Sequence, residues 1–123
     1  MASKFSEIVK PFVEQELVLA LKAKSQGNYT IEFSHLENAH VIGQESTYWH
    51  VKVHCLMLYW ALRNSRPSEV LGQVFRVIGA ATKTVFGLVP TGNTGGANVS
   101  PFKVMPIKPE HAAIIRNARA RKP

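Results

Sequence analysis

The stretch HLENAHVIGQESTYWHVKVH, residues 35–54, decides the fold because it holds the end of one helix, a short turn and the start of the next helix. Apolar residues recur here every three or four positions, which predicts a helix over residues 29–42 that stops at Gly43. Ser46 or Thr47 suits the N-cap of a following helix that runs to about residue 64. The connection GQES is short, so the two helices are expected to be antiparallel neighbours.

Similar patterns extend the helical prediction to both sides of this stretch. A first helix is expected over residues 4–26, with Pro11 near its start and Gly27 at its end. After a break at NSRPSE, where Ser65 can act as a cap, a fourth helix is expected to run to about Phe86. Residues 87–109 are rich in Gly and Pro and predict an ordered, irregular segment, and residues 110–123 predict a short helix with a basic tail. We therefore expect one all-α domain over residues 1–123, a compact four-helix fold of two helical hairpins.

The two predicted hairpins resemble each other weakly. A shift of 38 residues places Leu36 on Val74 and Ala39 on Val77, close to the period of tetratricopeptide (TPR) repeats. Glu32 stands where that motif favours a small residue. A TPR-like pair of hairpins and a compact four-helix arrangement both remain open at this point.

The charge distribution and the cysteine count limit which partners and which cellular location are expected. Residues 1–45 carry four Lys against six Glu, a net of −2, and residues 46–123 carry eleven Lys/Arg against two Glu, a net of +9. The positive charges are spread along predicted helices, so we expect no direct binding of nucleic acid. With one cysteine, no signal peptide pattern and no apolar run long enough to span a membrane, the chain is expected to be cytoplasmic.

Two aromatic pairs on the third predicted helix point to contacts beyond that helix. Tyr48 and Trp49 form the first pair, and Tyr59 and Trp60 form the second. Helical spacing turns part of this set outward, where it would form a surface for a protein partner or a homodimer. Packing against the C-terminal segment is the alternative.

Four of the five histidines fall in the opening stretch, which makes it the candidate site. His50 and His54 are four residues apart on the face that also carries Val53, Met57 and Ala61, so both imidazoles should point inward. His40 lies just before the turn and should stand at a similar height. Glu37 shares the side of His40, whereas His35 lies about 140° away around the helix. We expect His40, His50 and His54 to form one set that Glu37 or His35 completes.

Such a set predicts a transition-metal site. Imidazoles with at most one carboxylate suit Zn, Cu, Ni or Fe and not Mg or Ca. Hydrogen-bonded structural histidines are the alternative, since neutral imidazoles can satisfy one another. Met57 is expected in the core and Cys55 is expected to be a structural, buried residue without a metal role.

Other catalytic patterns are missing from the sequence. The loop PTGNTGGANVS, residues 90–100, has no GK[ST] and no preceding strand, so it is not a phosphate-binding P-loop. We expect a tight loop that lies over the histidines as a lid. The chain has no Asp and no recognisable nucleophile, so we do not expect an enzyme.

The motifs HLENAHVIGQ, HVKVHCLML, EVLGQ, GNTGGANVS and MPI together resemble a small bacterial family known only as a domain of unknown function. The resemblance covers about residues 27–109. It implies histidines at positions 35, 40, 50 and 54, an acid at position 37, and genes for heavy-metal resistance nearby. The chain departs from the family at Glu32, where Ala is usual, and in the length of its first helix.

Three functions follow as hypotheses. The first is metal binding, sensing or handling by a His-rich site. The second is a TPR-like interaction module whose histidines are structural. The third is a small metal-dependent oxidoreductase, since helical bundles with His and Glu ligands support redox chemistry.

Overall fold

The structure, a computed structural model, describes residues 3–85, 90–100 and 102–121 and holds five α-helices in them. They are α1 (Lys4–Ser25), α2 (Tyr29–Gly43), α3 (Thr47–Arg63), α4 (Pro67–Val85) and α5 (Pro109–Ala120). No strand occurs in these described ranges, so the all-α prediction is confirmed. The predicted end of the fourth helix at Phe86 lies outside the described residues.

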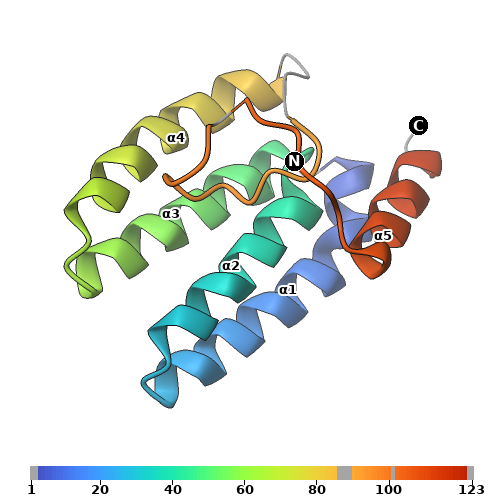
Figure 1. The fold of residues 1–123 in the computed structure, drawn as a ribbon. Coiled ribbons are helices and arrows are strands. Elements are labelled where there is room, and N and C mark those ends of the chain that lie inside the picture. Colours follow the sequence, from blue (N-terminus) through green and yellow to red (C-terminus); the bar gives the residue numbers. More distant parts are fainter. Residues whose placement is uncertain (1–2, 86–89, 101, 122–123) are drawn as a thin grey trace.

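Two pairs of consecutive helices make up most of the molecule (Figure 1). α1 packs mainly against α2, α3 packs mainly against α4, and α2 and α3 join the two pairs. Helix α5 lies against α1 and α2. The segment that follows α4, orange in Figure 1, passes across the helices before α5 begins. The relation of the two pairs to tetratricopeptide repeats stays a prediction.

Side-chain caps fix where the helices begin. Ser46 accepts a hydrogen bond from the backbone N–H of Trp49 at 3.2 Å, as predicted for one of the two candidate caps of α3. Asn28 does the same for α2. Ser65 does not cap α4 as expected: its φ of 51° is left-handed, and it ends α3 while Arg66 donates to the carbonyl of Ala61 at 2.9 Å.

The hydrophobic core lies where α1, α2 and α3 meet. It is built mainly of buried apolar residues that include Phe5, Val9, Val13, Leu36, Ala39, Ile42, Trp49, Val53, Met57 and Ala61. The indole N–H of Trp49 donates to the backbone carbonyl of Ser6 at 3.1 Å and so joins α3 to α1. At Gly43 a Cβ atom would lie 2.8 Å from the Cβ of Trp49, so only glycine lets α3 start this close to α2. The turn that the sequence predicted thereby places the start of α3 against the end of α2.

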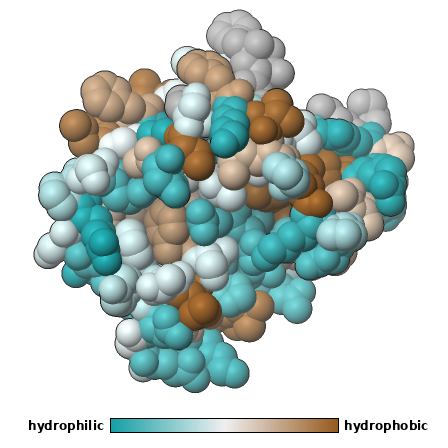
Figure 2. Space-filling model, viewed as in Figure 1, coloured by the Kyte–Doolittle hydropathy of each residue, from teal (hydrophilic) through white to brown (hydrophobic). Residues whose placement is uncertain are grey.

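Helix α4 turns Gln73 inward and exposes several of its large apolar side chains. Gln73 is fully buried, whereas Leu71, Phe75 and Ile78 are 62%, 66% and 65% exposed. Figure 2 shows hydrophobic side chains gathered at the upper left, where α4 runs. Despite this apolar surface, no helix in the described ranges is long and apolar enough to cross a membrane. On the inward side of α4, Gln73 contacts His54.

Candidate metal centre

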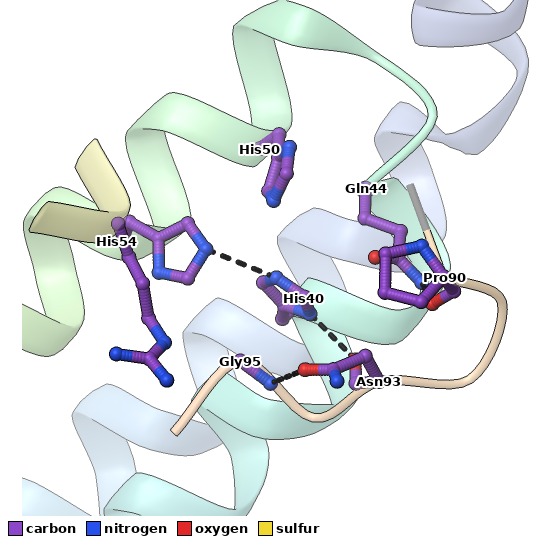
Figure 3. A pocket seen from close by; sticks show the side chains of 8 residues that line it. His40, Gln44, His50, His54, Pro90, Asn93 and Gly95 are labelled. Atoms are coloured by element: carbon purple, nitrogen blue, oxygen red, sulfur yellow. Dashed lines mark hydrogen bonds between the residues drawn. The ribbon is translucent and has the colours of Figure 1, made fainter. Parts of the chain in front are cut away.

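Three histidines meet between the end of α2 and the first half of α3 (Figure 3). His40, His50 and His54 are 2%, 3% and 3% exposed. One ring nitrogen from each lies within 4.8 Å of the others, and no other group of three such side chains is found among the described residues. The structure therefore brings together the three histidines that the sequence placed in one set.

Backbone chemistry fixes the tautomer of His40. Its Nδ1 lies 2.7 Å from the carbonyl oxygen of Asn93. A carbonyl only accepts hydrogen bonds, so the proton of His40 is on Nδ1. In the neutral ring, Nε2 then carries a lone pair.

A buried glutamine fixes His54 in the same way. Gln73 donates from Nε2 to Glu69 Oε2 at 2.6 Å and to the carbonyl of Gly95 at 2.9 Å. These two acceptors determine which end of the amide is nitrogen, so Oε1 faces His54 Nδ1 at 2.7 Å and accepts its proton. His54 Nε2 is therefore also the lone-pair nitrogen of a neutral ring.

The two Nε2 atoms face each other at 3.1 Å. Two lone pairs at this distance repel each other unless a proton or a metal ion lies between the rings. In a tetrahedral zinc site with Zn–N bonds of about 2.0–2.1 Å, ligand nitrogens stand roughly 3.3 Å apart. A histidine that binds metal through one ring nitrogen usually donates a hydrogen bond to the protein from the other nitrogen, as Nδ1 does in both rings here. This pair already has the spacing and tautomers of two ligands.

His50 completes the group from one turn earlier on α3. Its ring centroid lies 4.9 Å from those of His40 and His54. The three rings surround a small cavity of about 10 Å³, which is roughly the space of one water molecule. Gln44, Arg76, Pro90, Asn93 and Gly95 complete its lining. The cavity is as small as one water molecule, and the three imidazoles of the group border it.

The loop predicted as a lid contacts His40 directly. Asn93 is 2% exposed, and its amide donates to the carbonyls of Ser100 and Lys103, each at 2.8 Å. Its Oδ1 accepts the N–H of Gly95 at 2.9 Å. The side chain of Asn93 thus holds the loop in the shape that presents its own carbonyl to His40.

The structure places His35 and Glu37 outside the histidine group. His35 Nδ1 lies 2.9 Å from Glu16 Oε1 on α1, and Asn38 donates to the same oxygen. Glu37 faces another hollow of the surface, beside Glu69. Burial, and then the charge of Glu69, raises the pKa of Glu37 above its ordinary value. Neither side chain shares the cavity of the three imidazoles.

The other residues weighed as ligands have separate roles. Met57 is fully buried in the core, as expected. Cys55 is exposed and not buried as expected, because it lies on the side of α3 that faces away from the core. Glu32, which was not a ligand candidate, is buried and forms an ion pair with Arg63. A partner on the neighbouring helix therefore explains why an acid is tolerated there.

Sequence patterns missed Gln73 and Arg76 on α4 and the specific roles of Asn93 and Gly95. A polar residue in the middle of an amphipathic helix normally faces solvent, so nothing marked Gln73 as buried. The one signal was the density of Gly and Asn in residues 90–100, which indicated a tight loop with specific hydrogen bonds.

Comparison with known proteins yields one match. The model of a family described as "Protein of unknown function (DUF3703)" matches residues 7–115, nearly the whole chain. No curated protein is significantly similar to it, and neither is any solved structure. The match covers all three histidines, Gln73 and the loop around Asn93.

Proposed function

We propose that this chain, which belongs to the DUF3703 family of proteins of unknown function, binds one transition-metal ion through His40, His50 and His54 and acts in metal binding, sensing or handling. The observation that carries the proposal is the facing pair of Nε2 lone pairs of His40 and His54 at 3.1 Å. An ion between them replaces a repulsion with two bonds. Glu37 and His35 are not part of the proposed ligand set.

The donor set favours a borderline metal. Three neutral imidazoles suit Zn, Cu, Ni or Fe, and they offer too little charge and no oxygen for Mg or Ca. Three protein ligands also leave a coordination position open, as in sites where zinc holds an exchangeable water. A cytoplasmic location is part of the proposal, since the single cysteine, Cys55, permits no intramolecular disulfide.

Structural histidines are the competing interpretation, and they predict a different chemistry for the same cavity. Without a metal, one of the facing Nε2 atoms must hold a second proton, which places an imidazolium in a buried site. Burial of a charged ring is unfavourable unless an acid compensates it. In a metal-free interaction module, this second proton would lie between His40 and His54 and be shared by their two Nε2 atoms.

Elemental analysis of protein produced without a His-tag separates these interpretations. We expect one equivalent of metal in the wild type and in a His35→Ala control, and none in a His50→Ala/His54→Ala double variant. Calorimetric titration of the metal-free protein should give a dissociation constant below about 1 μM, near −8 kcal/mol. Weaker binding, or equal binding by the double variant, would rule the metal function out.

A further inference from the structure

Arg76 lies beside the three histidines and is an unusual neighbour for a metal ion. It lines the same cavity, and burial lowers its pKa. Its Nη2 donates to the carbonyl of Val99 at 2.7 Å, and its Nη1 donates to the carbonyl of Gly72 at 3.2 Å. Its Nε is buried and has no hydrogen-bond partner among the described residues. A water or an anion in the cavity would give this buried donor an acceptor.

The charges around the cavity point to the same conclusion. The three ligands are neutral, so a divalent ion and Arg76 would place two cations in one poorly solvated region. Glu69 is the acid that acts on Arg76, but it does not line the cavity, and hydrogen bonds from Gln73 and from the backbone N–H of Ala97 hold its Oε2. Like charges that are taken out of water repel strongly unless an anion lies between them.

We propose that the metal carries a small anion as its fourth ligand and that Arg76 stabilises this anion. The inference rests on the proposed metal function and defines the ligand class of that site. The metal would lie between the ring nitrogens, so the anion has a space of about 10 Å³, which admits hydroxide or one end of azide and excludes larger oxyanions. Arg76 would be a positioning residue for the anion, since all three metal bonds from the protein come from the histidines.

The test uses Co(II) as the metal and sodium azide as the anion, followed by visible absorption. We expect azide to change the Co(II) spectrum of the wild type with saturation. Arg76→Gln should bind one Co(II) yet lower the azide affinity at least 10-fold. Arg76→Lys keeps the charge and should fall between the two, and Arg116→Gln on the exposed side of α5 is the matched control.

The outcomes separate the two proposals. If Co(II) is not bound, the metal function fails and the anion inference fails with it. If Co(II) is bound but azide leaves the wild-type spectrum unchanged, or Arg76→Gln and Arg76→Lys bind azide as the wild type does, only the anion inference is overturned. If Arg76→Gln fails to fold, the azide titrations of the wild type and of Arg76→Lys still test the anion inference.

The outer face of α4 carries a second, independent inference. Over residues 67–82, every exposed side chain of this helix is uncharged, although the chain has a net charge of +7. The exposed residues are Pro67, Ser68, Leu71, Val74, Phe75, Ile78, Ala81 and Thr82. Leu71, Phe75 and Ile78 are spaced as a stripe that packs against another helix.

The geometry points to a second copy of this chain as the occupant of that face. A different partner of so basic a protein would gain from opposite charges, and this face offers none. The exposed residues of 67–82 are uncharged, so this part of α4 meets its own copy without repulsion. At the start of α4 lies a groove lined by Leu62, Val70 and Leu71, and Arg66, which precedes the helix, is the one charged residue of its lining. A two-fold axis across α4 would place the Phe75 of each copy near the groove of the other.

Sedimentation of the full chain at about 10–100 μM tests the dimer. We expect a dimer that persists at high salt, a monomer for Leu71→Glu, and a dimer for Leu21→Glu, whose leucine is equally exposed at 62%. A monomeric wild type, or a dimer that Leu71→Glu leaves intact, overturns the inference. Binding of the monomer to phospholipid vesicles would assign the face to a membrane surface instead.

Discussion

Gly95 lies so close to His40 that a Cβ atom at residue 95 would stand 2.5 Å from Cδ2 of the imidazole. Its φ of 86° is also a conformation that side chains disfavour. We expect Gly95→Ala to lower the free energy of unfolding by about 2–5 kcal/mol, from backbone strain and overpacking together. Metal affinity should fall as well, because His40 must move. Denaturant unfolding and metal titration measure the two effects.

Gly27→Ala is the control for that variant. Gly27 has a φ of 71°, and a Cβ there would meet nothing within 4 Å. In Gly27→Ala, backbone strain alone should lower the free energy of unfolding, by about 1–2 kcal/mol. The variant should bind metal as the wild type does. Equal losses in the two variants would contradict the close contact between residue 95 and His40.

Gln73→Met should separate the hydrogen bonds of Gln73 from its volume. The change keeps the size of a fully buried side chain but removes the acceptor for His54 and the donor to Glu69. Metal affinity is expected to fall about 10–100-fold, as it does when the hydrogen-bond partner of a metal-binding histidine is removed in other proteins. The free energy of unfolding should fall by about 1–3 kcal/mol. Gln15→Met on the exposed side of α1 should change neither quantity, and unchanged metal affinity in Gln73→Met would refute the tautomer assignment.

Glu37→Gln should stabilise the protein at neutral pH. Burial and the neighbouring Glu69 raise the pKa of Glu37 in the folded state above 4.5, so the folded protein holds this proton more tightly than the unfolded chain. The associated stability is present below pH 4.5 and is lost as the pH rises through the raised pKa. Thermal unfolding should therefore show a Tm gain for Glu37→Gln at pH 7 that vanishes near pH 4. A gain of the same size at both pH values would exclude this cause.

Single substitutions should divide the histidines of the opening stretch into two groups. His40→Ala is expected to abolish metal binding, because it removes one of two facing ligands. His35→Ala should leave the metal affinity within about twofold, since His35 contacts Glu16 and not the cavity. Isothermal titration of the metal-free variants measures both. A large loss in His35→Ala would mean that the ligand set differs from the one proposed.

The helices and the histidine group were largely predictable because both depend on local spacing. Four-residue spacing puts His50 and His54 on one face, and the short turn after Gly43 brings His40 beside them. The orientation of α4 was not predictable in this way. Its apolar stripe would be turned toward the core on periodicity alone, yet the structure exposes Phe75 and buries Gln73. Partners from distant segments decide that orientation, and no pattern within one helix contains them.

The sequence by itself determined the all-α class and where the first three helices begin and end to within a residue or two. It also placed His40, His50 and His54 in one group, although it kept Glu37 and His35 as further candidates. These follow from periodicity, capping and turn length, which act over a few residues. Only the tertiary structure decided the chemistry of the group. The proton positions of His40 and His54 depend on Asn93 and Gln73, which are 53 and 19 residues away along the chain. Hydrogen bonds between groups so far apart in sequence exist only after packing has brought them together.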